Sequence, residues 1–309
     1  MDLNQSQQKA EARNKLYSLL GDLPDRNRPI SAVKLDEKDC GSYNLEMLSL
    51  DLNGIEPVSA YVAKPKNTNG KRLPCVIYNH YHGGLHHIGR KEFVQNDRPY
   101  SVHEPYAKVL TDLGYIAICI DAWNFGDRAG RTESELFKEM IWNGQVLWGM
   151  MVYDYLRSVD YMLSRDDVDP AKLATMGLSL GSTAAWWLAA LDERIALTVD
   201  LCCATDFDEI MRIRNLDGHG IYYYVPSLLK HFSASDIMAL IAPRKRLSLN
   251  GKFDKLTPID GLHKIDADMK TEYARCGAPE NWRMIIDNCG HMETSLMRRE
   301  IIDFFKANF

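Results

Sequence analysis

Residues 172–191, KLATMGLSLGSTAAWWLAAL, join a short apolar run to a helix-forming segment. The run at 172–176 predicts a buried strand, and residues 182–191 predict a helix. Gly177-Leu178-Ser179-Leu180-Gly181 lies directly between them. A G-x-S-x-G sequence in this context predicts a sharp turn that holds a nucleophilic serine clear of the sheet, and only glycines fit where the turn brings backbones together. An ordinary turn that contains a serine is the alternative.

A serine hydroxyl is a poor nucleophile without a base, and the base should come from a later loop. His291, in NCGHMET, follows a predicted buried strand and precedes the last predicted helix. We therefore predict that His291 is the base. A surface histidine that caps the last helix is the alternative interpretation, and His263, in a polar and helical stretch, is the rival base.

The imidazole of the base needs a carboxylate that fixes its tautomer. Asp254, in NGKFDKLTP, directly follows a predicted strand and is the first candidate. Asp206 is the second and Asp260 the third, and a turn-forming role is the alternative for Asp254. The chain order Ser179, Asp254, His291 favours Asp254, because each residue would lie at the edge where open α/β sheets bind ligands.

Buried strands alternate with amphipathic helices along most of the chain. This alternation predicts a single α/β domain with a mostly parallel central sheet, helices on both faces and an N-terminal antiparallel hairpin. We expect a helical extension at 1–43 and the domain at 44–309, with a possible cap inserted at 206–240. The predicted strands are 44–52, 58–66, 73–80, 115–121, 172–176, 195–203, 244–251 and 281–287. The predicted helices are 5–20, 106–113, 182–191 and 295–307, with 132–150 extending the helix that carries Val152 to Leu163.

The loop NHYHGGLHH, residues 79–87, follows one of the predicted buried strands. An acyl-transfer enzyme needs two backbone N–H donors aimed at the oxyanion. Leu180, the residue after the candidate nucleophile, would supply one donor. The glycines of the loop would let its backbone approach a substrate, so we predict the N–H of His82 as the second donor, with that of Tyr81 as the other choice.

The four histidines of this loop also suggest a metal site. His80 and His82 are two residues apart, which places both on one side of an extended strand. No carboxylate lies between residues 79 and 87, and no later cluster of cysteine, histidine and aspartate has ligand spacing. We therefore expect no metal and no cofactor, and His86 and His87 are expected to be polar loop residues.

The stretch DAWNFGDR, residues 121–128, leaves another predicted strand and should reach the same edge of the sheet. Trp123 could form an apolar wall, and Arg128 could bind an acidic substrate. A pairing of Asp127 with Arg128 that holds the loop is the plainer alternative. The candidate substrate-binding residues are Tyr81, Trp123 and Arg128.

The charge and the cysteines of the chain limit its partners and its compartment. The formal net charge is −5, and no block of lysine or arginine stands out, so we expect neither nucleic acid nor a membrane as a partner. A small-molecule ester substrate and a possible homo-oligomer remain. Seven cysteines without a CxxC pair indicate free thiols in a reducing compartment. Because no run resembles a signal peptide or a membrane span, a cytoplasmic location is expected.

Five motifs together resemble the α/β-hydrolase superfamily: GLSLG, NHYHGG, DAWNFGDR, GKFDKLTP and CGHMET. The chain is most similar to dienelactone-hydrolase-like and acetyl-xylan-esterase-like serine esterases, which are related to the catalytic domain of prolyl oligopeptidases. The resemblance covers roughly residues 45–309. It implies the same site residues, with Ser179 as nucleophile, Asp254 as acid, His291 as base, and Leu180 and His82 as oxyanion donors.

The chain departs from the family pattern in three respects. Dienelactone hydrolases proper have a cysteine nucleophile, where this chain has Ser179. The usual His-Gly of the oxyanion loop is His80-Tyr81 here. No propeller domain precedes residue 45, which argues against a dedicated oligopeptidase.

These observations predict a serine hydrolase that cleaves carboxylic esters of small or medium acyl groups through an acyl-enzyme intermediate. A peptidase or a thioesterase with the same triad is the alternative within this class. A metal-dependent hydrolase built on residues 80–87 is an alternative of a different class, and chelation would abolish its activity. A non-catalytic binding module is another, and a broken triad would indicate it.

Overall fold

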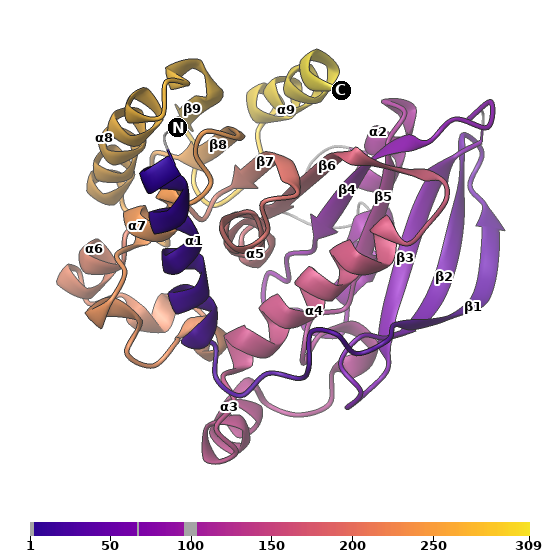
Figure 1. The fold of residues 1–309 in the computed structure, drawn as a ribbon, viewed down its shortest axis with the longest axis horizontal. Helices are drawn as coiled ribbons and strands as arrows, with labels where there is room; N and C mark the ends of the chain where they lie inside the picture. Colours follow the sequence, from indigo (N-terminus) through magenta and orange to yellow (C-terminus); the bar gives the residue numbers. More distant parts are fainter. Residues whose placement is uncertain (1–2, 67, 96–103) are drawn as a thin grey trace.

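In the computed structural model, which describes residues 3–66, 68–95 and 104–309, nine strands join one sheet. The strands are β1 (Ser31–Asp39), β2 (Tyr43–Asp51), β3 (Val58–Pro65), β4 (Leu73–Asn79), β5 (Ile116–Ile120), β6 (Val168–Leu178), β7 (Ile195–Leu201), β8 (Lys245–Gly251) and β9 (Trp282–Asp287). Their order across the sheet is β1-β2-β3-β5-β4-β6-β7-β8-β9 (Figure 1). The pairs β1–β2, β2–β3 and β3–β5 are antiparallel. The remaining pairs are parallel. The predicted mostly parallel sheet with an N-terminal antiparallel hairpin is confirmed.

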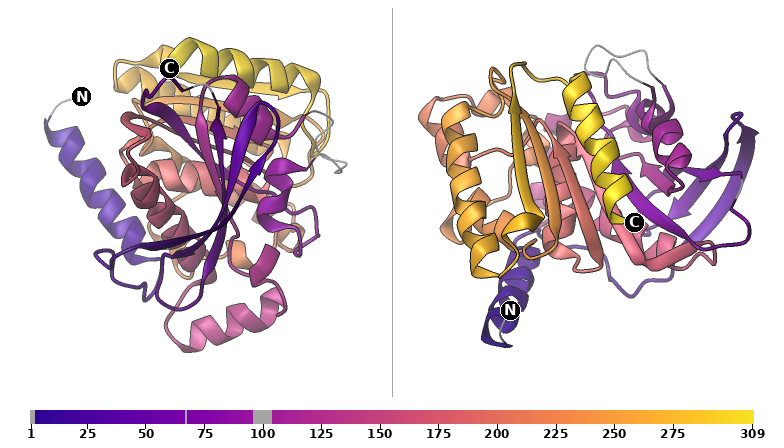
Figure 2. Two further views of the ribbon diagram at one scale, coloured as in Figure 1. Left: turned by 90° about the vertical axis from the view of Figure 1, so that its right-hand side faces the viewer. Right: turned by 90° about the horizontal axis from the view of Figure 1, so that it is seen from above.

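Helices cover both faces of the sheet (Figure 2). The helices are α1 (Leu3–Ser18), α2 (Tyr106–Asp112), α3 (Glu133–Trp142), α4 (Leu147–Leu163), α5 (Leu180–Leu191), α6 (Phe207–Arg212), α7 (Ala234–Ala239), α8 (Ile259–Arg275) and α9 (Ser295–Asn308). The apolar side chains of α1, α4, α5, α7 and α8 form the core on one face, and those of α2 and α9 form the core on the other. Of the helices in the described ranges, none is long and apolar enough to cross a membrane.

The segment 1–43, which was predicted to be helical, also contains a strand. β1 pairs with β2 at the edge of the sheet, and all nine of its residues are exposed. Val33 and Leu35, its aliphatic residues, are 58% and 64% exposed. The strand was not predicted, because an alternation of only two aliphatic residues among charged ones is too short to indicate a strand. Helix α1 lies on the opposite side of the molecule from β1 (Figure 1). Lys9 of α1 donates a hydrogen bond to the carbonyl of Ala242 over 2.7 Å.

The prediction that residues 132–150 extend the following helix is wrong, because α3 and α4 are separate helices. A capping box begins α3, in which the Thr132 side chain accepts from the N–H of Glu135. Gly144 has a φ of +74° after the end of α3, a left-handed conformation that commonly ends a helix. The N–H of Gln145 then donates to the carbonyl of Met140 over 2.8 Å, which closes the turn before α4.

Residues 206–240, here called the cap segment, leave the carboxyl end of β7 and return to β8. The segment contains α6, α7 and three short 3-10 helices at Leu216–Gly218, Ile221–Tyr223 and Leu228–Lys230. Several of its side chains belong to the core on the α4 and α5 face of the sheet, so the cap segment packs on the domain.

The end of β4 lies in direct contact with the beginning of α5. A Cβ atom on Gly177 would lie 2.5 Å from the carbonyl oxygen of Asn79, and a Cβ atom on Gly181 would overlap with the same oxygen. The Asn79 side chain donates to Thr175 Oγ1 over 3.0 Å and to the carbonyl of Met176 over 3.1 Å. The close contact therefore requires glycine at both positions, and the hydrogen bonds of the buried Asn79 side chain stabilise it.

We expect Gly181→Ala to lower the free energy of unfolding by at least about 3 kcal/mol, because overpacking against the rigid backbone forces β4 and α5 apart. Urea unfolding followed by circular dichroism measures this change. Gly290→Ala is the matched control, since its added Cβ would meet nothing within 4 Å. Equal stability of the Gly181→Ala and Gly290→Ala proteins would contradict the tight contact.

Candidate active site

Ser179 lies at the turn between β6 and α5. Its φ of +57° and ψ of −118° lie in a region that residues other than glycine rarely adopt. Such strain persists only where the surrounding structure enforces it, and it is common at functional sites. The N–H of Ser179 donates to the carbonyl of Leu201, at the end of β7, over 2.9 Å. The serine is therefore held at the carboxyl edge of the parallel sheet, as the G-x-S-x-G sequence predicted.

A hydrogen-bonded chain of three side chains begins at Ser179. His291 Nε2 lies 2.8 Å from Ser179 Oγ, and His291 Nδ1 lies 2.7 Å from Asp254 Oδ2. Because a carboxylate can only accept, Nδ1–H donates to Asp254, and Nε2 is left to accept the serine proton. The structure thus brings together the three residues that the sequence predicted to act together.

The loops after β8 and β9 place the last two of these residues. Asp254 is 4% exposed, and its Oδ1 accepts from the N–H of Leu256 over 2.8 Å. The N–H of Phe253 donates to the carbonyl of Cys289 over 2.9 Å, which ties the two loops together. These bonds fix the position of the carboxylate relative to His291.

Two opposing effects act on the pKa of His291. Burial disfavours the charged imidazolium and lowers the pKa, while the hydrogen bond and the negative charge of Asp254 raise it. The contribution of Asp254 is the stronger in sum, so the pKa of His291 is raised above its usual value of 6.5. A raised pKa makes the imidazole a better acceptor for the serine proton.

The rival residues lie away from Ser179. His263 is exposed on α8. Asp206 caps α6 by accepting from the N–H of Glu209 over 2.9 Å, and Lys264 lies 3.0 Å from its other oxygen. The side chain of Asp260 is 73% exposed. These positions favour His291 and Asp254 over the rivals.

A cavity of about 220 Å³, here called the Ser179 cavity, opens beside the three side chains. Its lining consists of His82, Gly83, Gly84, Ser179, Leu180, Thr183, Cys203, Gly218, His219, Gly220, Tyr222, Tyr223, Leu256 and His291. The lining comes from the loop after β4, the beginning of α5, the loops after β7, β8 and β9, and the cap segment. The cap segment therefore forms one wall of the cavity.

The two residues predicted as oxyanion donors both line this cavity. Leu180 is the first residue of α5, and the N–H groups of a first helical turn have no partner within the helix. The loop of His82 continues through Gly83 and Gly84, whose φ angles are +52° and +80°. Glycines in this conformation let the loop turn back over Ser179.

Cys203 is the one cysteine in the lining of the cavity. Burial raises the pKa of this thiol, so it stays protonated at neutral pH. A protonated thiol is a weak nucleophile, which favours Ser179 over Cys203 as the candidate nucleophile.

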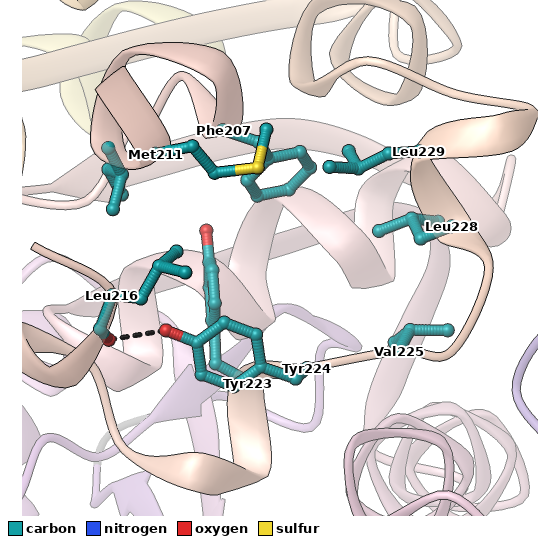
Figure 3. A pocket seen from close by; sticks show the side chains of 9 residues that line it. Phe207, Met211, Leu216, Tyr223, Tyr224, Val225, Leu228 and Leu229 are labelled. Atoms are coloured by element: carbon teal, nitrogen blue, oxygen red, sulfur yellow. Dashed lines mark hydrogen bonds between the residues drawn. The ribbon is translucent and has the colours of Figure 1, made fainter. Parts of the chain in front are cut away.

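A second pocket of about 150 Å³ lies in the cap segment (Figure 3). Its lining is apolar and aromatic, and Figure 3 shows Tyr223 and Tyr224 on one side with Phe207 and Met211 opposite. Tyr223 lines both this pocket and the Ser179 cavity. The ring of His219 stacks on Tyr223 with their centroids 4.9 Å apart. Tyr223 is therefore a packed side chain that separates the pocket in the cap segment from the Ser179 cavity.

The three residues predicted to bind substrate do not line the Ser179 cavity. Tyr81 is 2% exposed and packs in the core on the α2 and α9 face. Trp123 is 5% exposed, with the guanidinium of Arg128 4.3 Å from its ring. The prediction is therefore wrong for this cavity, because all three side chains are used inside the fold.

The alternative prediction, that Arg128 pairs with Asp127, is also wrong. It donates to Glu56 over 2.5 Å and to the buried Asp154 over 2.9 Å. Asp127 instead pairs with Arg90 over 2.7 Å. The loop after β5 is therefore held by partners that are distant in the sequence, and a local pattern could not indicate them.

His80 and His86, in the loop of residues 80–87, have partners within the protein. His80 Nε2 accepts from the N–H of Ala122 over 3.2 Å. His86 Nε2 lies 3.3 Å from Glu133, and its ring stacks on Phe125 with centroids 4.7 Å apart. His87 is exposed. These contacts give the loop a structural explanation that needs no metal.

In the described part of the chain, the one group of three potential metal ligands within 4.8 Å of one another is Cys202, Asp254 and His291. The nitrogens of His291 and one oxygen of Asp254 already take part in the hydrogen-bonded chain. The thiol of Cys202 donates to the carbonyl of Met292 over 3.5 Å, and burial raises its pKa. The protonation of this group suits acid–base chemistry better than metal ligation.

Comparison with known proteins places this site in a family. The chain is 48% identical over 298 residues to the Bacillus subtilis (strain 168) protein "Putative hydrolase YtaP", covering 96% of this chain and 99% of that protein. The chain belongs to the α/β-hydrolase family. No family model matches it.

Solved structures share the fold of this α/β hydrolase at low identity. A "putative acetyl xylan esterase" from Bacteroides fragilis has a TM-score of 0.71 at 19% identity, over 91% of this chain and 74% of its own. A glucuronoyl esterase from Solibacter usitatus has a TM-score of 0.74 at 14% identity, over 97% of this chain and 91% of its own. The arrangement of strands and helices is therefore that of the α/β-hydrolase fold.

The sequence analysis of this α/β hydrolase missed the residues that the cap segment brings to the Ser179 cavity. These are His219, Tyr222 and Tyr223, which lie in GHGIYYY, residues 218–224. Three consecutive tyrosines between Ile221 and Val225 were the available signal. The signal was insufficient, because only the packing of the 3-10 helix decides which tyrosine faces the cavity.

We expect an NMR titration of His291 to give a pKa above 6.5, and Asp254→Asn to lower that pKa, because the substitution removes the negative charge that raises it. A pKa of His291 that does not respond to Asp254→Asn would contradict the electrostatic account.

Proposed function

We propose that this α/β hydrolase cleaves carboxylic esters through an acyl-enzyme intermediate on Ser179. The unbroken hydrogen-bonded chain from Asp254 through His291 to Ser179 carries the proposal. The base lies within hydrogen-bond distance of both the nucleophile and the orienting carboxylate, which is the arrangement that acyl transfer requires. The strained turn at Ser179 supports it further, since it exposes the hydroxyl to the cavity.

In the first half-reaction, Ser179 Oγ attacks the ester carbonyl carbon while His291 Nε2 takes the hydroxyl proton. The carbonyl oxygen becomes an oxyanion, which the N–H groups of Leu180 and His82 stabilise. The imidazolium of His291, stabilised by Asp254, then gives its proton to the leaving alcohol as the carbon–oxygen bond breaks. An acyl group remains on Ser179.

In the second half-reaction, a water molecule takes the place of the alcohol. His291 removes a proton from this water as it attacks the acyl carbon, and a second oxyanion forms at the same donors. Collapse of the intermediate releases the acid and returns the proton to Ser179. Because the neutral imidazole is the base in both steps, activity should increase as the pH rises through the pKa of His291.

The size of the Ser179 cavity limits the acyl group. Its volume is about 220 Å³, and a cavity of about 150 Å³ in another protein holds a benzene molecule. We infer that the acyl group is small or medium, of a few carbon atoms. The solved structures with the same fold include proteins named as an acetyl xylan esterase and a glucuronoyl esterase, which supports ester cleavage over peptide cleavage.

A reducing compartment, the cytoplasm, is part of the proposal. All seven cysteines are free, and five of them are buried. Free buried thiols suit a compartment in which disulfides do not form.

We expect Ser179→Ala to lower kcat for p-nitrophenyl acetate by at least about 10³-fold, because it removes the hydroxyl that is hydrogen-bonded to His291. Initial rates at pH 8 measure this loss. Ser182→Ala is the matched control, since Ser182 is a buried serine one turn further along α5 and does not line the cavity. Full activity of the Ser179→Ala protein would contradict the mechanism.

A further inference from the structure

Tyr222 reaches the Ser179 cavity from the cap segment and lies opposite the loop after β4. It belongs to the 3-10 helix Ile221–Tyr223, and 5% of it is exposed. Its hydroxyl lies 3.0 Å from Nε2 of His82. The two residues are 140 positions apart, so the contact joins the cap segment to the loop that carries the proposed oxyanion donor.

The direction of this hydrogen bond follows from the other ring nitrogen of His82. The backbone N–H of Gly84 donates to His82 Nδ1 over 3.0 Å. Nδ1 therefore carries no proton, and a neutral imidazole with a bare Nδ1 carries its proton on Nε2. It follows that Nε2–H donates to the oxygen of Tyr222, and that the hydroxyl proton of Tyr222 points away from His82.

The ring of Tyr222 is packed against a neighbouring aromatic ring, which fixes the position of its oxygen atom. Trp148 stacks on it with centroids 6.2 Å apart and an angle of 28° between the rings. The backbone of the neighbouring Ile221 lies beside the carboxylate of Glu133, which also pairs with His86 over 3.3 Å. The cap segment and the loop after β4 are thus joined by a second contact beside the tyrosine.

The hydroxyl of Tyr222 keeps its proton at neutral pH. Burial, together with the nearby charge of Glu133, raises its pKa well above the ordinary value. Within residues 3–66, 68–95 and 104–309, His82 is the one hydrogen-bond partner of this hydroxyl. A buried O–H without an acceptor is unfavourable until water or a ligand oxygen accepts from it.

We propose that the O–H of Tyr222 donates a hydrogen bond to an oxygen atom of the substrate that is not part of the reacting ester group. The site would then favour esters that carry an ether, a hydroxyl or a second carbonyl oxygen near the scissile bond. This inference rests on the proposed function, because it requires an ester bound at Ser179. The reacting carbonyl has its own proposed donors in Leu180 and His82, which leaves Tyr222 for a different oxygen.

Two pairs of matched esters test this assignment. The first pair, p-nitrophenyl methoxyacetate and p-nitrophenyl butyrate, exchanges an oxygen for a methylene group in the acyl part. The second pair, 2-methoxyethyl acetate and butyl acetate, makes the same exchange in the alcohol part. The ratio of kcat/KM within each pair is compared between the unmodified protein and Tyr222→Phe, so that differences in chemical reactivity cancel.

We expect Tyr222→Phe to lower the oxygen-to-methylene ratio about tenfold in one of the two pairs, since the net effect of one hydrogen bond is about that large. Tyr224→Phe is the matched control. Its hydroxyl donates to the carbonyl of Leu216 within the same cap segment, and Tyr224 does not line the Ser179 cavity. Both ratios should be unchanged in this control.

Unchanged ratios in both pairs for Tyr222→Phe would overturn the assignment. An equal loss with all four esters would also overturn it, because the hydroxyl would then act on the reacting carbonyl. If the unmodified protein hydrolysed none of the four esters, the proposed function would fail, and this inference with it.

The orientation of the hydroxyl can be checked without any ester. A ¹⁵N NMR spectrum of the side chain of His82 distinguishes the two neutral tautomers. The proposal requires the proton on Nε2, and a proton on Nδ1 would reverse the direction of the hydrogen bond and contradict it.

Discussion

The contact between the beginning of α5 and the end of β4 determines the geometry of the site. At Gly181 the helix approaches so closely that any side chain would overlap with the carbonyl oxygen of Asn79. This approach forces the strained backbone of Ser179, which in turn lifts its hydroxyl from the sheet edge. The same approach places the N–H of Leu180 beside that hydroxyl and brings the loop after β4 next to it. Nucleophile and proposed oxyanion donors are therefore consequences of one steric constraint.

The groups proposed to take part in the reaction and the group proposed to select the substrate come from different parts of the fold. Ser179, Asp254 and His291 follow three parallel strands, β6, β8 and β9, whose positions are fixed by the sheet. Tyr222 comes from the cap segment, which consists of short helices and is tied to the domain by side-chain contacts. A rigid edge suits the precise distances of acyl transfer. A segment of short helices can change without disturbing those distances, so that one fold can accept different esters.

The sequence was sufficient for the parts of the structure that depend on local patterns. The buried strands, the turn at Ser179 and the order of the triad residues each have a signal within a few positions. It was insufficient where distant partners decide. Arg128 was predicted to face a substrate, but it pairs with the buried Asp154 on α4. β1 gave only a short alternation at Val33 and Leu35, because the strand buries neither face. The role of Tyr222 depends on His82, 140 positions away, and on the tautomer that Gly84 imposes on that ring.

The central claim is that Ser179 is an activated nucleophile. Incubation with a fluorophosphonate, followed by intact-mass measurement and peptide mapping, tests it most directly, because such reagents react with a serine only when a neighbouring base and oxyanion donors assist. We predict the addition of one phosphonyl group per chain, located on the peptide that contains Ser179, and slower labelling at a pH below the pKa of His291. An unmodified chain, or labelling at a different residue, would contradict the account.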